Sequence, residues 1–289
     1  MTRPGGTRSW TGRRPPRASP TGPAAYSGDV EDVPRWLAQD EAAMPPGLDW
    51  LSARERARLD GMRFTKRRTE FLLRRWVGKY AVARSLGDPP DAAAAARIEM
   101  LNHPTGAPYV EVDGRRADLD VSLSDRAGTA VALVGPPGSG PGTLGIDLEV
   151  VEPRSEGFVR DFLTGSEAEW VRRRRDRDGD DGWQEAANLV WSAKEAALKV
   201  LRVGLRADTR TVEVAVEEER RDDGWASMTV TSVRGEVFPG WWRRDGVFLL
   251  TIAFAPGGPF PEPPRLSPGG VDLAAATPVH SWMDRHLAT

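Results

Sequence analysis

The stretch from Gln184 to Leu205 constrains the fold more than any other part of the chain, because it predicts a long amphipathic helix. Helix-favouring alanine, leucine, lysine and glutamate dominate it, and Gly204 supplies a C-terminal stop. At 100° per residue, polar and apolar side chains separate onto opposite stripes. The polar stripe consists of Asn188, Trp191, Glu195, Lys199 and Arg202, and the apolar stripe of Val190, Ala193, Ala197, Val200 and Leu201. The pattern predicts that the apolar stripe packs against the rest of the protein.

A strand with two acidic residues is predicted upstream, at Leu144–Val150. Leu144, Ile146 and Leu148 alternate with Asp147 and Glu149. Alternate Cα atoms of a strand lie about 6.6 Å apart on one face, so the two carboxylates repel each other unless a cation or proton intervenes. With Glu195 from the helix they would form an all-oxygen site, which suits Mg²⁺.

Each pattern also has an ordinary structural explanation. Glu195 and Lys199 could be a solvated i,i+4 pair that contributes about 0.3 kcal/mol. Asp147 and Glu149 could be solvated acids at a sheet edge. One compositional observation favours function: the chain has only four lysines, and two of them, Lys194 and Lys199, lie in this helix. Lysine supplies a compact point charge that suits a phosphate oxygen, whereas arginine supplies a planar fork.

Together the two stretches resemble a known family. Gly145-Ile-Asp-Leu-Glu149, followed some forty residues later by Trp191-Ser-Ala-Lys-Glu-Ala-Ala-Leu-Lys199, is similar to the signature pair of the surfactin-type (Sfp-like) 4′-phosphopantetheinyl transferases. Each half is a weak motif alone, and the ordered pair is more specific. The resemblance extends over roughly Leu51 to Phe254.

The resemblance implies an α+β fold with two similar halves, a pseudo-duplicated arrangement in which each half has a helix packed on a small, mainly antiparallel sheet. We place the halves at residues 30–140 and 142–255, with the metal and transfer motifs in the second. The breaker-rich segment Gly135–Gly142 would be the hinge, and it lacks the Gly-Lys-Ser/Thr ending of a phosphate loop. No internal sequence repeat is evident.

The activity implied is Mg²⁺-dependent transfer of 4′-phosphopantetheine from coenzyme A to a serine of an apo acyl or peptidyl carrier protein, with release of adenosine 3′,5′-bisphosphate. Mn²⁺ is an alternative ion. The resemblance assigns Asp147, Glu149 and Glu195 to the metal and Glu195 and Lys199 to catalysis. It assigns Arg68, Arg75, Ser124, Lys194 and Lys199 to coenzyme A. Arg202 and Arg206 would help dock the carrier.

The helix predicted from Phe64 to Leu86 carries the arginines that match the family. Phe64, Phe71, Leu72, Trp76 and Val82 recur at helical spacing together with its cations, and Gly87 ends the run. The generic interpretation is a surface helix whose basic side chains snorkel. In the family a matching helix holds coenzyme A phosphates; Arg68 and Arg75 fit best, Arg67 is an alternative to Arg68, and Lys79 lies behind them.

Two positions depart from the family pattern. Ala107 replaces a lysine expected near the adenine nucleotide, and Asp125 replaces a histidine that contacts a phosphate. A carboxylate repels a phosphate, so Arg126 would have to take over or the loop would have to differ. These departures motivate an alternative function: an altered relative that binds coenzyme A or a carrier protein with little or no transfer.

Composition excludes several other classes. The chain has 289 residues, no cysteine and a net charge of −2, which excludes disulfides and thiolate sites and gives no general attraction to nucleic acid or anionic lipid. No apolar run approaches a membrane span and the basic N-terminus is no secretory signal, so we predict a cytoplasmic monomer without membrane or nucleic-acid partners. Residues 1–28 predict a disordered tail, and residues 256–289 a Pro/Gly linker and C-terminal tail.

Local patterns predict the remaining elements. Ser52–Glu55 and Ser166–Glu169 fit the capping box that opens a helix. The mixed-sign run Arg172–Asp181 suggests a solvated loop. Alternating apolar residues predict strands at 211–217, 226–233, 241–242 and 247–254, with hairpin spacing that suggests a sheet packed on the central helix.

Overall fold

The computed structural model describes residues 33–136, 138, 142–202 and 208–280. The predicted tail at residues 1–28, the stop at Gly204 and the docking residue Arg206 lie outside this part of the chain. None of the helices described is long and apolar enough to cross a membrane.

The helices and strands fall into two sets along the chain. The N-terminal set comprises β1 (Arg35–Asp40), the 3₁₀ turn η1 (Glu41–Ala43), α1 (Ala53–Asp60), α2 (Thr65–Ser85), α3 (Ala92–Arg97), β2 (Ile98–Asn102), β3 (Pro108–Val112), β4 (Arg115–Arg116), β5 (Val121–Arg126) and β6 (Thr129–Val134). The C-terminal set comprises β7 (Leu144–Val150), α4 (Glu156–Phe162), α5 (Gly165–Val200), η3 (Thr209–Thr211), β8 (Val212–Val216), β9 (Ala226–Ser232), β10 (Val237–Asp245), β11 (Phe248–Phe254) and β12 (Arg265–Leu266). The mixture confirms the α+β class.

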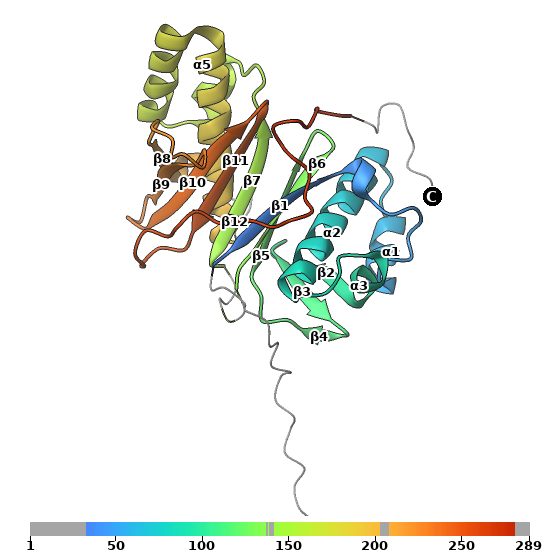
Figure 1. Ribbon diagram of the computed structural model, residues 1–289. Helices are drawn as coiled ribbons and strands as arrows, with labels where there is room; N and C mark the ends of the chain where they lie inside the picture. The colour runs from blue at the N-terminus through green and yellow to red at the C-terminus, as the bar shows by residue number, and fades with distance from the viewer. Residues whose placement is uncertain (1–32, 137, 139–141, 203–207, 281–289) are drawn as a thin grey trace, which may run out of the picture.

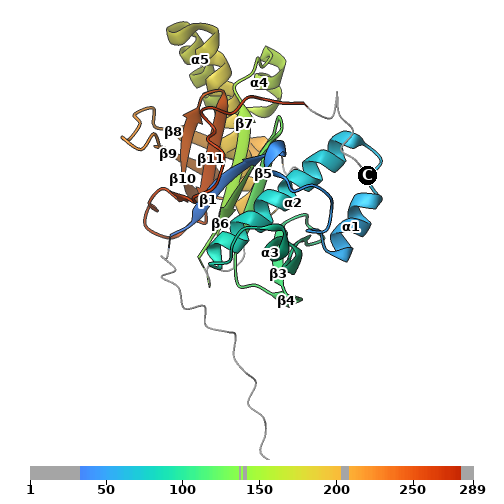
Figure 2. The same cartoon turned by 45° about the vertical axis from the view of Figure 1, so that its right-hand side comes forward.

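The strands form three sheets, with orders β12-β1-β6-β5, β2-β3-β4 and β7-β11-β10-β9-β8. Helix α2 packs on one face of the first sheet and α5 on one face of the third, as Figures 1 and 2 show from two directions. Alternate residues of β6 separate two cores: Ala130 and Ala132 pack with α2, whereas Val131 and Leu133 pack against β7 and β11. The molecule is therefore layered as helix, sheet, sheet and helix.

The two sets share a strand order. In the first, β1 pairs with β6 and β6 with β5; in the second, β7 pairs with β11 and β11 with β10, and every one of these pairs is antiparallel. The hairpins β2–β3 and β8–β9 also correspond, but β9 pairs with β10 whereas β3 belongs to a separate sheet.

A buried lysine in α2 anchors the first set. Lys79 has no exposed side chain; its ammonium lies 2.6 Å from Glu55 and donates to the carbonyl oxygens of Trp50 and Ala95. Glu55 also closes the capping box with Ser52 at the start of α1. Three donors meet three acceptors, so the buried charge is compensated.

A buried lysine in α5 makes the same set of contacts. The Lys194 ammonium lies 2.7 Å from Glu167 and donates to the carbonyl oxygens of Thr209 and Val212, again with no exposed side chain. Glu167 closes a capping box with Thr164. Each glutamate also accepts from a strand N–H, Met100 on β2 for Glu55 and Val214 on β8 for Glu167.

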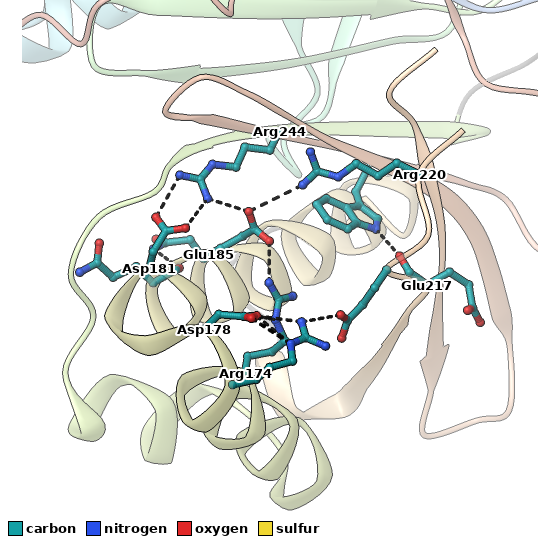
Figure 3. A network of polar contacts seen from close by, with 12 residues as sticks. Arg174, Asp178, Asp181, Glu185, Glu217, Arg220 and Arg244 are labelled. Carbon is teal, nitrogen blue, oxygen red and sulfur yellow. Dashed lines mark hydrogen bonds and ion pairs between the residues drawn. The ribbon is translucent and has the colours of Figure 1, made fainter. Parts of the chain in front are cut away.

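Helix α5 is interrupted by a break at Gly179, whose φ of 70° and ψ of −152° only glycine adopts readily. A network of arginines and acids spans the break (Figure 3). Glu185, after the break, accepts from Arg174, before it, at 2.9 Å and from Arg244 on β10 at 2.7 Å. The two segments also approach closely, since a Cβ on Gly182 would lie 2.5 Å from the Arg174 carbonyl oxygen. This network fixes the segment that carries Trp191–Lys199.

The interface between the sets depends on side chains of β5. Asp120, just before β5, accepts from the backbone N–H of Thr143 at 2.7 Å and of Leu144 at 3.2 Å. Ser122 accepts from the N–H of Ile146 at 3.0 Å. Because β5 and β7 belong to different sheets, these side chains take the place of a backbone ladder.

The C-terminal segment packs along β1, dark red beside blue in Figure 1, and is more than the predicted linker. It adds β12 in parallel to β1, and its Val271 donates a backbone hydrogen bond to Ala38. Leu273 is buried in the core between the sheets. Val279 donates to the carbonyl oxygen of Ala127 in the β5–β6 turn, so these backbone bonds tie the segment to the N-terminal set.

Two local predictions were wrong. The capping box of α5 uses Thr164 and Glu167 instead of Ser166 and Glu169. Two such pairs overlap in this stretch, and the burial of Glu167 against Lys194 decides between them. The run Arg172–Asp181 is helical on both sides of Gly179, because ion pairs organise its charges.

Candidate active site

Strand β7 directs Asp147 and Glu149 toward α5, as its alternation predicts. Ile146 and Leu148 point the other way, into the core between the sheets. Gly145 lets the strand approach the helix, since a Cβ there would lie 2.1 Å from the Ala196 carbonyl oxygen. The glycine of the motif is therefore a packing requirement.

Asp147 is buried and held from several directions. Its Oδ1 accepts from Ser124 at 2.8 Å and from Lys199 at 2.7 Å, and its Oδ2 accepts from Ser192 at 2.8 Å. Ser124 belongs to β5 of the N-terminal set, so this carboxylate joins the two sets. Lys199 also donates to the carbonyl oxygen of Ile146.

Glu149 is buried among cations. Its Oε1 accepts from the Trp191 indole at 3.1 Å, and its Oε2 lies 3.1 Å from Arg126 Nε and 3.4 Å from Arg154. Burial and the charge of Asp147 raise the pKa of Glu149 to about 7, against the opposing effect of the two arginines. Ionisation of the Glu149 carboxyl is therefore less favourable here than in water.

Glu195 lies one helical turn beyond Trp191 and is half-buried. Burial, followed by the charge of Asp147, raises the pKa of Glu195 to about 7, and Lys199 opposes the shift. In the part of the chain that the structure describes, no hydrogen bond or ion pair engages its carboxylate. The three predicted metal ligands thus lie close enough to repel one another, and Glu195 is the one whose carboxylate accepts no hydrogen bond from the described residues.

A cavity of about 340 Å³ opens between the two sets; the acid among its described lining residues is Asp120, and Asp147, Glu149 and Glu195 do not line it. From the C-terminal set, Leu144, Lys199 and Arg202 line it. The N-terminal wall includes Arg58, Met62, Phe71, Arg74, Arg75, Asn102, Ala107, Pro108, Ser122 and Leu123. Lys199 both lines the cavity and binds Asp147, so it connects the cavity to the acids.

Arginines converge on the N-terminal wall. Arg58 and Arg75 both donate to the side-chain oxygen of Asn102, at 2.9 and 2.7 Å. Burial lowers the pKa of Arg75 to about 10; Glu55 opposes the shift, and the charges of Arg58 and Arg74 add to it. An anion in the cavity would relieve this repulsion between cations.

The predicted coenzyme A residues fall in different places. Arg75 and Lys199 line the cavity. Arg68 donates to the carbonyl oxygen of Leu59 and is absent from the cavity lining, and Ser124 is bound to Asp147. Lys194 is fully buried with its three donors used inside the protein, which leaves it no contact to offer a phosphate.

Sequence reasoning missed Arg58 and Arg74 as cavity residues and considered Arg202 only for docking. Arg74 lies one residue before Arg75, but helical spacing alone does not say which side faces a cavity. Arg202 reaches across the interface to Asp120 at 2.7 Å, a contact 82 positions distant in sequence. No local pattern signals it.

The two departures from the family pattern have structural counterparts. Asp125 forms an ion pair with Arg74, so its charge is compensated. The neighbouring Arg126 pairs with Glu149 and Glu152 instead of turning into the cavity. Ala107 lines the cavity, where it offers apolar surface in place of a cation.

No group of three or more histidine, cysteine, aspartate or glutamate side chains within the described ranges is already arranged to hold a metal ion. The three acids nevertheless offer only oxygen donors, the type that Mg²⁺ prefers. Arg126 and Arg154 would have to release Glu149 for it to become a ligand.

A comparison with family models gives a match in this region. Residues 143–230 match the 4′-phosphopantetheinyl transferase superfamily. No curated protein matches the chain. The superfamily match spans β7 to β9 and so includes Asp147, Glu149, Glu195 and Lys199. It supports a transferase of phosphopantetheine, and the N-terminal wall of the cavity lies outside it.

Proposed function

We propose that the chain transfers 4′-phosphopantetheine from coenzyme A to a serine of an apo acyl or peptidyl carrier protein, as the Sfp-like enzymes do. The observation that carries this proposal is Lys199, which lines a cation-rich cavity and at the same time binds Asp147. A molecule with several phosphates would lie along the cavity with one phosphate at the acids.

Coenzyme A would be held by cations from both sets. Arg58, Arg74 and Arg75 supply the N-terminal wall, and Lys199 and Arg202 the C-terminal wall. Phe71 and Pro108 supply apolar surface beside them. We retain Arg75 and Lys199 from the sequence predictions, add Arg58, Arg74 and Arg202, and do not retain Lys194. Arg68 and Ser124 would act by supporting the neighbouring backbone and Asp147.

We propose that Mg²⁺ is held by Asp147, Glu149 and Glu195. The donor chemistry fits, and the Glu195 carboxylate accepts no hydrogen bond from the described residues. When bound, the ion would neutralise charge on the pyrophosphate. Without a metal ion, Arg126 and Arg154 balance the negative charge of Glu149.

The reaction requires the carrier serine oxygen to form a bond to the β-phosphorus while the bond to the nucleotide phosphate breaks. Lys199 would stabilise charge on the departing adenosine 3′,5′-bisphosphate. The serine proton must leave, and Glu195 is the candidate acceptor within the chain. The nucleophile belongs to the partner, so the chain needs no nucleophile of its own.

The pseudo-duplicated arrangement is also a proposal. It is supported by the shared strand order and by the matched contacts of Lys79 and Lys194. In a pseudo-twofold monomer the cavity would lie between the two halves. This agrees with its described lining residues, which come from both sets.

The test is to incubate the purified protein with coenzyme A, Mg²⁺ and an apo carrier and to weigh the intact carrier. We expect a mass increase of one phosphopantetheine group, and none when the carrier serine is replaced by alanine. Carriers of fatty-acid, polyketide and peptide type should each be tried.

The altered relative remains the second candidate, favoured by the arginines on Glu149 and by Ala107 in the cavity. Calorimetric binding of coenzyme A without a mass increase on any carrier would support it. Failure to bind coenzyme A would contradict the transferase, and failure to bind both coenzyme A and a carrier would contradict both functions.

A further inference from the structure

Ser192 and Thr251 form a buried hydroxyl pair behind Asp147. Both side chains are fully buried, and their oxygens lie 2.8 Å apart. Ser192, on α5, lies 2.8 Å from Asp147 Oδ2, and Thr251, on β11, is the residue paired with Asp147 in the sheet. Helix, central strand and edge strand thus meet at one carboxylate.

The directions of these hydrogen bonds follow from counting protons. An ionised carboxylate only accepts, and a serine hydroxyl has one proton. Ser192 therefore donates to Asp147 and must accept from Thr251. The chain Thr251 to Ser192 to Asp147 runs in one direction, so each hydroxyl is fixed by the next.

The hydrogen bonds of Asp147 leave one lone pair of its carboxylate unused. Two lone-pair positions exist on each carboxylate oxygen. Oδ1 uses both, for Ser124 and Lys199, whereas Oδ2 uses one, for Ser192, within the described residues. With Oδ1 and Oδ2 held from three sides, the carboxylate cannot rotate without breaking a hydrogen bond.

Helix α2 shows that the fold does not need this hydroxyl. It carries the same Trp-x-x-Lys spacing in Trp76 and Lys79, and Val77 stands where α5 has Ser192. Val77 is also fully buried. A valine would contribute more apolar burial than a serine, so the serine is explained by its contact with Asp147.

We propose that Ser192, oriented by Thr251, is a positioning residue that fixes the orientation of the Asp147 carboxylate and leaves one Oδ2 acceptor with which it would bind the metal. This inference rests on the proposed function. Groups behind metal ligands commonly change metal affinity by about 10–100-fold when removed, which sets the expected effect.

The test measures the Kd for Mn²⁺ by electron paramagnetic resonance of the free ion, with coenzyme A at saturation. We expect Ser192→Ala to raise this Kd about 10–100-fold. Thr251→Val keeps the shape but removes the donor to Ser192, and we expect a smaller increase in the same direction. In transfer assays the KM for Mg²⁺ should rise more than kcat falls.

Ser232→Ala is the matched control. Ser232 is a buried serine of β9 whose hydroxyl binds Glu236, and it does not contact Asp147. Its replacement should leave the Kd for Mn²⁺ unchanged while thermal unfolding reports the cost of losing a buried hydroxyl.

The outcomes separate this inference from the proposed function. If Mn²⁺ binds wild type and both Ser192→Ala and Thr251→Val with equal affinity, the positioning role is overturned and the transferase stands. If Ser232→Ala weakens binding equally, the effect is general loosening and the role is also overturned. If wild type transfers phosphopantetheine without any divalent ion, the metal assignment and this inference both fail.

Discussion

Helices α2 and α5 each place a tryptophan and a lysine three residues apart against a sheet. Trp76 and Lys79 do so in α2, and Trp191 and Lys194 in α5. Each lysine reaches the glutamate of a capping box through an ion pair of 2.6 or 2.7 Å. The two ion pairs are alike, but the helix faces beside them differ. Helix α2 packs mainly against apolar residues, whereas α5 packs beside Asp147 and Glu149.

The differing positions are the informative ones. Counted from the tryptophan, α5 has Ser192, Glu195 and Lys199 where α2 has Val77, Tyr80 and Arg84. Strand β7 adds Asp147 and Glu149, whereas Leu37 of β1 packs with the apolar residues of α2. The tryptophan and the buried lysine are common to both, so they belong to the scaffold. The residues found in α5 and β7 alone are those that carry the proposed chemistry.

The largest effect should come from Glu195→Gln, which removes a charge that α2 lacks. We expect transfer to fall by about 10²–10⁴-fold, the range for losing an acid–base group. The control is Tyr80→Phe at the corresponding position of α2, which should leave transfer unchanged. Initial rates on an apo carrier, with thermal unfolding of both variants, make the comparison.

Next in size is the loss of either buried lysine. Lys79→Met and Lys194→Met should each lower the free energy of unfolding by about 3–5 kcal/mol, because each leaves a buried glutamate without its partner. Urea unfolding measures both. A Lys194 variant that kept full stability but lost coenzyme A binding would show that Lys194 binds phosphate, and the comparison would break.

A smaller effect is expected at the ends of the two helices. Lys199→Arg should lower kcat/KM about tenfold despite the retained charge, because a planar fork cannot reproduce the point contacts with Ile146 and Asp147. Arg84→Lys, at the exposed corresponding position of α2, should change nothing measurable. Equal kinetics for Lys199→Arg and wild type would remove Lys199 from the proposed machinery.

The smallest effects should be equal in the two sets. Ser52→Ala and Thr164→Ala each remove the side-chain acceptor of a capping box and should cost about 1 kcal/mol of unfolding free energy. Thermal or urea unfolding would report both. A clearly larger loss for one of them would show that the two boxes are not equivalent supports for their lysines.

The sequence predicted the parts of the fold that depend on local periodicity. The alternation of Leu144–Val150 placed Asp147 and Glu149 on the face toward α5, which the structure confirms. The helix predicted from Phe64 to Leu86 followed from the same kind of pattern and is found at Thr65–Ser85. The cofactor and metal assignments stay predictions.

Contacts between distant residues could not be predicted in this way. Lys194 lies beside Glu195 in the motif, yet its contacts are with Glu167 and two carbonyls far along the chain. The same holds for Arg202 with Asp120 and for the segment after Phe254 that packs on β1. Burial depends on tertiary packing, which a helical wheel does not contain.

The bonds from Asp120 and Ser122 to the β7 backbone have a consequence for how such a protein can change. Two sheets joined by a backbone ladder have a fixed spacing of about 4.8 Å. Here the distance between β5 and β7 depends on the lengths of the Asp120 and Ser122 side chains. Replacing one of them would change the width of the cavity without shifting the strand register within either sheet. The separation of the two walls can thereby be changed, in evolution or by design, while the hydrogen bonding within each sheet stays as it is.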